Sequence, residues 1–403
     1  MKFSKLSQLF LVSTIGLLVA TFLTACQLVT IDYLYVADSA GSGTGSAGQI
    51  ETFAVDSQSG AIRTIDPPVS TGGTGPFALA TSSDYANLYL ANQGNNTVVH
   101  FSVASNGVLT KKDTITTATK PVFLAVNEAG TYLYVVSGTS SATLTEYALS
   151  SGTIGSASST ITMSLPSYAG DTLVPTGVNV LLNNSAVYAT VYDQSAYNPG
   201  GTPTSTANPG WIFGFSVGSG GSLTAVSGSP YLAGIKPTAI TSDPTNRFIY
   251  ATDFASNQLI GYTVQSTNNL NFLLNGPFRT GSEPDSIVID PRGKYIYLAN
   301  ALDSSLSAYS ITLATGTPST LAYTPGSASD STDTEPLAIT VDPALGRFVY
   351  TANFLGNSVS GFRLDPDTGI LSLTQATPYP TGAGPSALIC VPHGNHSLQS
   401  VTP

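Results

Sequence analysis

Two short phrases alternate along the whole of this 403-residue chain. One is an apolar stretch around a tyrosine, such as "YLYVAD" or "FIYATD", and the other is a proline followed by alternating apolar residues, such as "PTAITSDP". The tyrosines are Tyr35, Tyr89, Tyr134, Tyr188, Tyr250, Tyr297 and Tyr350, and the prolines are Pro76, Pro121, Pro175, Pro237, Pro284, Pro336 and Pro385. Each phrase therefore occurs seven times, at a period of about 50 residues that is typical of a repeat architecture.

The segments between these phrases predict further strands. A short apolar stretch such as "VVHFSV" or "LIGYTV" follows each tyrosine phrase, and a Gly or Asn turn then leads to a weaker strand such as "GVLTKKDTITT". β-Branched and aromatic residues dominate these stretches, and no sustained helical period occurs after residue 26. Four strands in each of seven repeats predict an all-β fold, a seven-bladed β-propeller of four-stranded antiparallel blades.

The two ends of the chain predict how the ring closes. The chain opens with a tyrosine phrase that has no proline phrase before it, and it closes with a proline phrase, "PSALICV", that has no tyrosine phrase after it. An open ring would expose sheet edges. We therefore expect one C-terminal strand to complete a blade with three N-terminal strands, "YLYVAD", "QIETFAV" and "AIRTIDP", in a monomeric domain spanning residues 33–394 with a tail at 395–403. Cys390 is expected to be a buried apolar residue in that strand.

The repeats resemble a known family. The pattern "P-x-A-hydrophobic … D-P-x-G-[KR]-[FY]-hydrophobic-Y … A-N" is clearest at Pro284–Asn300 and Pro336–Asn353. It is similar to the lactonase-like seven-bladed propellers, which include 6-phosphogluconolactonases and grade into "YVTN"-repeat surface proteins. The resemblance implies the propeller fold and, as one possible activity, hydrolysis of sugar lactones.

The residues that the resemblance would make catalytic are missing. The family pattern has Arg-His after one proline, a second His before the next proline and a Glu after the Asn of the tyrosine phrase. None of the seven prolines here is followed by Arg-His, and Asp243, Asp290 and Asp342 stand before the second proline. His100 falls in a third strand, away from a central channel, and the other two histidines are near the C-terminus. No catalytic residue can therefore be assigned from the sequence.

The N-terminus predicts export and lipidation. Lys2 and Lys5 precede an apolar run from Leu9 to Ala25, which is typical of a secretory signal peptide spanning residues 1–25. Leu23-Thr24-Ala25-Cys26 resembles the bacterial lipobox, which implies a lipid on Cys26 and a linker at residues 26–32. We expect a bacterial protein anchored in the cell envelope, on the periplasmic or outer surface.

The composition excludes one class of partner. Charged residues make up 9% of the chain and the net charge is −10. Nucleic-acid binding needs clustered Lys and Arg, so no nucleic acid is expected.

Candidate ligand-binding residues come from the turns that lead into the seven innermost strands, which meet at the mouth of a propeller. The residues before the prolines include Lys120 and Lys236 on one side of the ring and Glu283 and Glu335 on the other, with Asp285, Asp330 and Asp333 nearby. This arrangement suits a small polar ligand, a polysaccharide or a protein segment, and a Ca²⁺ ion at the acidic side is an alternative. Solvated loop tips would give the same pattern. No cofactor or other metal is predicted.

An insertion in the fourth blade, Val191–Trp211, adds three aromatic residues, Tyr192, Tyr197 and Trp211. Long loops with aromatic residues often bind partners, although a flap packed on the neighbouring blade is an equal alternative. Two functions remain open. One is a non-catalytic binding or scaffold propeller, and the other is a diverged lactonase.

Overall fold

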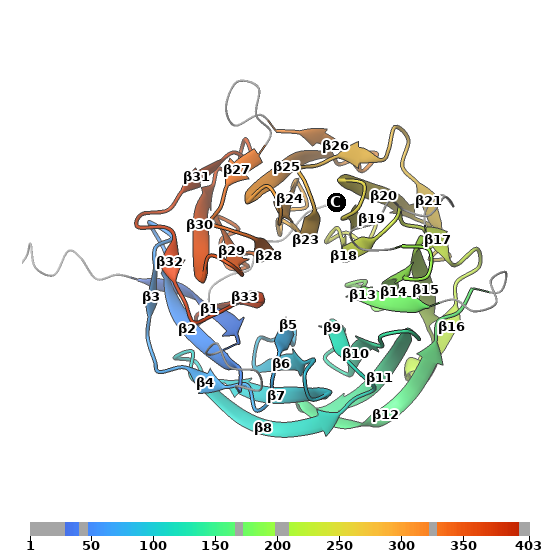
Figure 1. The fold of residues 1–403 in the computed structure, drawn as a ribbon, viewed down its shortest axis with the longest axis horizontal. Helices are drawn as coiled ribbons and strands as arrows, with labels where there is room; N and C mark the ends of the chain where they lie inside the picture. The colour runs from blue at the N-terminus through green and yellow to red at the C-terminus, as the bar shows by residue number, and fades with distance from the viewer. Residues whose placement is uncertain (1–28, 40–46, 166–171, 198–208, 322–328, 395–403) are drawn as a thin grey trace, which may run out of the picture.

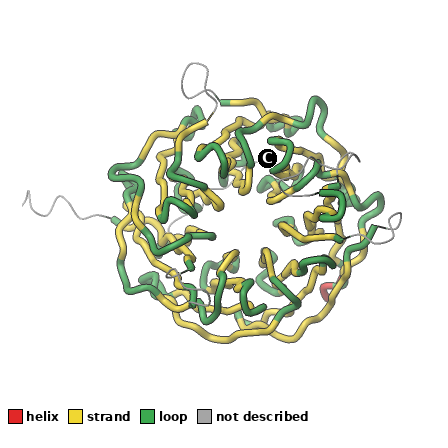
Figure 2. Tube along the Cα trace, in the orientation of Figure 1, coloured by secondary structure: helices red, strands yellow, loops and turns green. Residues whose placement is uncertain are grey.

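Seven antiparallel β-sheets are arranged as blades around a central axis, as Figure 1 shows. This computed structural model describes residues 29–39, 47–165, 172–197, 209–321 and 329–394. Figure 2 shows that strands and loops make up nearly all of the ring, and the only helix in these residues is the single turn η1 (Ser219–Gly221). The predicted seven-bladed β-propeller is confirmed.

The blades are numbered in chain order, and their strands are given from the axis outward. Blade 1 contains β33 (Ala387–Pro392), β1 (Thr30–Asp38), β2 (Gln49–Asp56), β3 (Ile62–Thr64) and β4 (Val69–Ser70). Blade 2 contains β5 (Pro76–Thr81), β6 (Asn87–Asn92), β7 (Thr97–Val103) and β8 (Leu109–Thr116). Blade 3 contains β9 (Pro121–Val126), β10 (Tyr132–Ser137), β11 (Thr143–Ser150) and β12 (Thr153–Thr162). Blade 4 contains β13 (Leu173–Val180), β14 (Ala186–Asp193), β15 (Gly210–Val217), β16 (Leu223–Ala225) and β17 (Tyr231–Leu232).

The remaining three blades repeat this arrangement. Blade 5 contains β18 (Pro237–Ser242), β19 (Phe248–Asp253), β20 (Gln258–Val264), β21 (Leu270–Phe272) and β22 (Phe278–Arg279). Blade 6 contains β23 (Pro284–Ile289), β24 (Tyr295–Asn300), β25 (Ser305–Thr312), β26 (Thr317–Thr320) and β27 (Ser329–Ser331). Blade 7 contains β28 (Pro336–Val341), β29 (Phe348–Asn353), β30 (Ser358–Leu364), β31 (Leu371–Leu373) and β32 (Tyr379–Pro380). In five blades the outermost strand is interrupted, so two short segments pair with the same third strand.

The hydrophobic core is divided among the contacts between neighbouring blades. Each of the seven clusters of buried side chains joins two adjacent blades, for example β1 and β2 of blade 1 with β6 and β7 of blade 2. Successive side chains of a strand point to opposite faces, so each blade contributes one face to each neighbour. This packing explains why the strands are apolar on both faces.

Six of the seven repeated tyrosines bond their blade to the next. All seven are fully buried in the second strand of their blade. Tyr250, for instance, donates a hydrogen bond of 2.6 Å to the carbonyl oxygen of Gly316, in the hairpin turn of the next blade. The same bond to that turn occurs in five more blades, from Tyr35, Tyr89, Tyr188, Tyr297 and Tyr350. The tyrosine phrase therefore carries both the core and the inter-blade bond.

Ring closure follows the predicted one-plus-three exchange. β33 pairs antiparallel with β1, from Asp32 opposite Pro392 to Ala37 opposite Ala387. The Ser386 hydroxyl donates a 2.6 Å hydrogen bond to the carbonyl oxygen of Pro76 in blade 2. β1 starts at Thr30, three residues before the predicted start of the domain at 33, because Ile31 already packs into the core. Cys390 is buried, as expected.

A pair of carboxyl groups lies where the closing blade meets blade 7. Asp32 and Asp342 are both fully buried, and the Asp342 carboxylate accepts the backbone N–H groups of Leu345 (2.7 Å), Arg347 (2.7 Å) and Phe348 (3.0 Å). The Asp32 carboxyl faces Asp342, and burial followed by this neighbour raises its pKa well above the ordinary value. Two adjacent buried carboxylates would repel each other, so this neighbour disfavours the ionised form of Asp32.

No helix in the described residues has the length and apolarity needed to cross a bilayer. The predicted signal peptide, residues 1–25, and the predicted lipid-bearing Cys26 lie outside the described residues, as does the tail at 395–403.

Candidate functional site

A cavity of about 460 Å³ lies at the centre of the ring, and all seven blades line it. Much of its wall is apolar and comes from the innermost strands, with Leu79, Val122, Phe123, Ile287, Ile339 and Leu388 among the lining residues. Its polar side chains include Gln93, Lys120, Tyr192, Lys236 and Asp285. A concave site of this size with a few polar groups suits a small molecule.

A β-bulge directs the residue after the inner-strand proline into this cavity. Pro284 pairs with Asn300 and Ser286 pairs with Ala299, so Asp285 has no partner on the neighbouring strand. The same register shift places Phe77 in blade 2 and Leu337 in blade 7. Bulges re-aim side chains next to functional sites. The blade repeat therefore fixes this position, and the amino acid there decides its chemistry.

The turns at the mouth are held by the preceding blade. The residue before the proline has a left-handed backbone in five blades: Gly75, Lys120, Glu283, Glu335 and Gly384. The N–H of Lys120 is bonded to Oδ1 of Asn96 at 2.7 Å, and the N–H of Glu283 to Oδ1 of Asn257 at 2.8 Å. Lys236 differs, because its N–H bonds at 2.9 Å to Asp253 of its own blade.

Asp285 is the most perturbed group of the cavity. Burial raises its pKa to about 7, with Glu335 and Glu283 acting in the same direction and Lys236 opposing them. No described residue donates a hydrogen bond to its carboxyl group, and no described cation lies within 4 Å of it. Asp285 can therefore give or take a proton near neutral pH and has its hydrogen-bonding capacity free for a ligand.

Lys236 comes from blade 5, next to the blade of Asp285, and its ammonium group lies near two aromatic rings. Its Nζ atom lies 3.9 Å from the centre of the Phe254 ring and 5.6 Å from that of Tyr197. Burial lowers the pKa of its ammonium group, while Asp285 and Glu283 act in the opposite direction. Lys120, by contrast, is exposed and has no ring partner among the described residues.

The other predicted acidic residues form the rim. Glu283 and Glu335 lie close enough to raise the pKa of Asp285, but neither lines the cavity. Ser358 donates a 2.8 Å hydrogen bond to Asp333, and this bond lowers the pKa of that carboxyl. The side chain of Asp330 is not among those described. Within the described ranges no three carboxylate, imidazole or thiol groups come together as a metal site, so calcium at the acidic side stays a prediction.

The aromatic residues of the insertion separate into two places. Tyr192 is the last residue but one of β14, lines the cavity and makes an edge-to-face contact with Tyr197, with ring centres 5.8 Å apart. Trp211 lies in β15, packs against the core between blades 3 and 4, and does not line the cavity. The part of the loop at 198–208 lies outside the described residues.

Phe254 is the site residue that the sequence did not predict. It follows Asp253 at the end of a tyrosine phrase, and its N–H donates a 3.0 Å hydrogen bond to the carbonyl of Lys236. Blade 3 makes the same bond from Gly138 to Lys120, at 3.2 Å. In five blades the residue after the tyrosine phrase makes this bond to the residue before the proline, so aligning the repeats would have paired the two positions.

Several polar residues of the blades are structural and lie away from the cavity. His100 is buried in β7, stacks on Tyr89 and contacts Asp113 at 2.5 Å. Asn300 and Asn353 are buried at the ends of tyrosine phrases and bond to serine hydroxyls of the next strand. No arginine or histidine of the described ranges lines the cavity, so the Arg-His set of the resemblance is not found among its described lining residues.

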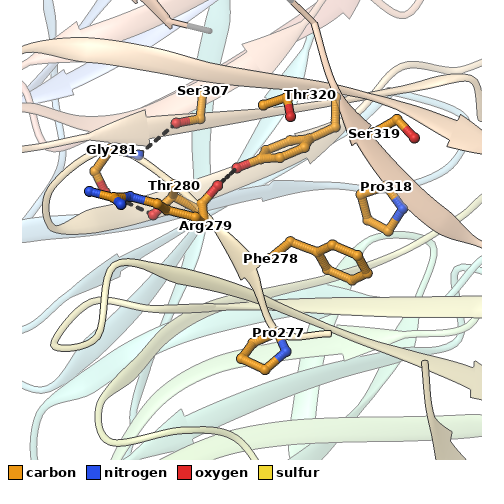
Figure 3. Close-up of a pocket in the computed structure, with 10 residues that line it drawn as sticks. Pro277, Phe278, Arg279, Thr280, Gly281, Ser307, Pro318, Ser319 and Thr320 are labelled. Atoms are coloured by element: carbon orange, nitrogen blue, oxygen red, sulfur yellow. Dashed lines mark hydrogen bonds between the residues drawn. The ribbon is translucent and has the colours of Figure 1, made fainter. Parts of the chain in front are cut away.

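A second concavity lies on the outer wall between blades 5 and 6 (Figure 3). It has a volume of about 530 Å³ and is bounded by Pro277 and Phe278 on one side and Pro318 on the other. The Tyr309 hydroxyl donates a hydrogen bond to the carbonyl of Arg279, and the N–H of Gly281 bonds to the Ser307 hydroxyl at 2.9 Å. These bonds hold neighbouring blades together. The described residues that line this groove include Arg279 but no acidic residue, whereas both Lys236 and Asp285 line the central cavity.

Comparison with known proteins identifies the family. The sequence pattern of the family "Lactonase, 7-bladed beta-propeller" matches residues 47–169 and 234–396. The chain belongs to this family. None of the curated proteins compared with it matches the chain.

Solved structures of lactonase-like propellers have the same fold. The periplasmic gluconolactonase of Pseudomonas aeruginosa superposes with a TM-score of 0.73 at 16% identity, over 90% of this chain and 99% of that one. A 6-phosphogluconolactonase-like protein of Bacteroides uniformis gives a TM-score of 0.72 at 17% identity, over 90% of this chain and 99% of that one. At this identity the likeness extends to the fold alone.

Proposed function

We propose that the central cavity binds a small hydroxyl-rich molecule and that a lipid anchor presents this site outside the cytoplasm. The observation that carries the proposal is the side chain of Asp285. It lines the cavity, and no described residue donates a hydrogen bond to its carboxyl group. A carboxyl group whose pKa is about 7 donates and accepts hydrogen bonds near neutral pH, which suits hydroxyl groups. The apolar wall suits the carbon skeleton of a sugar-like ring.

The charges of the mouth narrow the ligand class. Glu283, Glu335 and Asp285 stand on one side of the cavity, and among the described residues only two lysines, Lys236 and Lys120, line it. A phosphorylated ligand would meet repulsion from the acidic side. We therefore favour an uncharged ligand or one with a single negative charge.

Hydrolysis of lactones is the second candidate, and Asp285 also favours it. General bases work best when their pKa is near the working pH, and Asp285 meets this condition. In such a reaction Asp285 would take a proton from water as the water oxygen attacks the lactone carbonyl, and the Lys236 ammonium would stabilise the negative oxygen that forms. The ring C–O bond then breaks, Asp285 gives its proton to the leaving ring oxygen, and the hydroxy acid leaves.

Lipid anchoring rests on the sequence "LTAC" and on the position of β1. Thr30 begins β1 four residues after Cys26, so a lipid on Cys26 would keep blade 1 within about 14 Å of a bilayer surface. The full chain should fractionate with membranes and carry fatty-acyl mass on Cys26, and Cys26→Ala should abolish that acylation. A membrane-bound protein without an acyl group on Cys26 would contradict the anchor.

Calorimetry and acid release together test the two candidates. D-glucono-1,5-lactone, D-gluconate and glucose are titrated into the wild type, Asp285→Asn, Lys236→Met and Asp333→Asn, with and without Ca²⁺. Binding that Asp285→Asn and Lys236→Met remove and Asp333→Asn retains supports the cavity site. Lactone turnover above the spontaneous rate, lost in Asp285→Asn, would make the protein a lactonase, and no heat with any compound would contradict the proposal.

A further inference from the structure

We propose that Lys236 is a nucleophilic amine that captures small aldehydes or ketones in the central cavity as a reversible imine. The proposal deepens the proposed cavity site but does not require a hydroxyl-rich ligand. Its basis is a lysine that lines a cavity without an ion-pair partner, beside an acid able to transfer protons.

The position of the amine is fixed from three sides. Its Nζ atom lies over the Phe254 ring at 3.9 Å and faces the Tyr197 ring at 5.6 Å. The backbone N–H groups of Ile235 and Lys236 each bond at 2.9 Å to the Asp253 carboxylate, which holds the turn. The amine is therefore ordered before a ligand arrives, which lowers the entropy cost of reaction.

The surroundings of Lys236 favour a share of neutral amine. No carboxylate lies within 4 Å of it in the described residues, so it lacks the ion pair that holds most lysines protonated. Desolvation lowers its pKa, and Asp285 and Glu283 oppose this from a greater distance. The titratable groups that face it are Asp253, Glu283, Asp285 and Tyr197. Desolvated lysines near apolar groups are the ones that proteins use as nucleophiles.

Asp285 supplies the proton transfers that an imine needs. The neutral amine attacks the carbonyl carbon, the C=O electron pair moves to oxygen, and the nitrogen loses a proton while the oxygen gains one. Loss of water from this carbinolamine requires a proton on the leaving hydroxyl, which Asp285 can donate in its neutral form. Addition of water reverses the sequence, so no oxidant or reductant is consumed.

Lys120 is a control within the same molecule. It stands at the same position of the repeat, before the proline of the inner strand, and it lines the same cavity. It is exposed, however, and glycine replaces the aromatic residue beside it. Any difference in reactivity between the two lysines reports their surroundings and not their type.

The test is reductive trapping in the full-length protein purified in detergent. Glycolaldehyde and cyanoborohydride are added at pH 7.5, and peptide masses give the rate of modification at each lysine. Lys236 should be trapped about fivefold or more faster than Lys120. Equal rates at the two lysines would overturn the proposal, and this comparison needs no variant.

A second measurement separates the amine from the acid. Asp285→Asn should slow imine trapping at Lys236 about tenfold, but it should not slow acetylation by an N-hydroxysuccinimide ester, which needs only the neutral amine. Asp333→Asn, a rim acid outside the cavity, should change neither rate. Trapping that is unchanged by Asp285→Asn would overturn the role of Asp285. Failure of the proposed binding function would appear separately, as an absence of heat with sugars while Lys236 still reacts.

Discussion

Lys120 and Lys236 occupy the same place in two blades and have different surroundings. Each precedes the proline of an innermost strand, and each carbonyl accepts a hydrogen bond from the residue that follows the tyrosine phrase of its own blade. In blade 3 that residue is Gly138 and the lysine is exposed. In blade 5 it is Phe254, whose ring lies 3.9 Å from the amine. The repeat sets the position of a side chain, and its neighbours set its chemistry.

The blade that follows each lysine in the ring adds to the difference between their surroundings. Blade 4 has Thr176 after its proline, a hydroxyl that is bonded to Thr190 at 2.9 Å, so Lys120 has no acid from that side. Blade 6 has Asp285 at the equivalent position, within electrostatic reach of Lys236. The part of the cavity formed by blades 5 and 6 is therefore the part in which a lysine and an acid interact.

Replacing Asp285 by a neutral residue should have the largest effect, and this effect is on the free energy of unfolding. Asp285 has a folded-state pKa of about 7 against an ordinary 3.8, so it costs stability progressively as the pH rises from about 4 to 7. Asp285→Asn should raise the free energy of unfolding at pH 8 by on the order of 3 kcal/mol and leave it unchanged at pH 3. Urea unfolding at both pH values measures this.

Asp333→Asn is the matched control for that experiment. Its carboxyl has a lowered pKa, mainly because Ser358 donates a hydrogen bond to it. This group stabilises the fold above about pH 4, so its removal should lower stability at pH 8. If both variants shift stability in the same direction, burial is not what distinguishes Asp285.

The next largest effect should be a difference between the two lysines in how much each contributes to ligand affinity. Lys236→Met should weaken binding of D-glucono-1,5-lactone by about 30-fold, since a hydrogen bond to a charged group contributes about 2 kcal/mol. Lys120→Met should change the affinity less than about twofold, because exposed charges contribute little. Calorimetry measures both, and equal losses would mean that the whole mouth binds the ligand.

The buried carboxyl groups Asp32 and Asp342, where blade 1 meets blade 7, extend the comparison to a second pair of acids. The Asp32 carboxyl has a raised pKa from burial and from Asp342, so it destabilises the fold as the pH rises above about 4. Asp32→Asn keeps a donor toward Asp342 and should stabilise the protein at pH 8 by about 1–2 kcal/mol, with no gain at pH 3. Thermal unfolding at the two pH values tests this, and a loss of stability at pH 8 would show that Asp32 is ionised.

The smallest effect should come from the ring beside Lys236. Phe254→Leu retains an apolar neighbour but removes the aromatic face, whose attraction for an ammonium is about 0.5–1 kcal/mol. Acetylation of Lys236 near pH 8 should then rise about two- to threefold. Phe254→Ala admits water and should bring Lys236 toward the rate of Lys120. A slower rate in Phe254→Leu would mean that the ring does not act on the amine.

Much of the fold could be predicted from the sequence because the repeat carries it. Each tyrosine phrase supplies a buried strand, six of the seven tyrosine hydroxyls reach the next blade, and seven copies with unmatched ends require a ring closed by both termini. The interruption of the outer strand in five blades was not predicted. Short exposed strands have little apolar patterning, which leaves no signal of where they break.

The sequence alone determined the blade count, the ring closure, the family and the residues that reach the mouth, since these depend on spacing and on local turns. Only the tertiary structure decided which of those residues act together. It joined Asp285, Lys236 and Tyr192 in one cavity, placed Trp211 in the core and added Phe254. The physical reason is that pKa and hydrogen-bonding capacity depend on burial and on neighbours brought from other blades, and one repeat does not encode its neighbours.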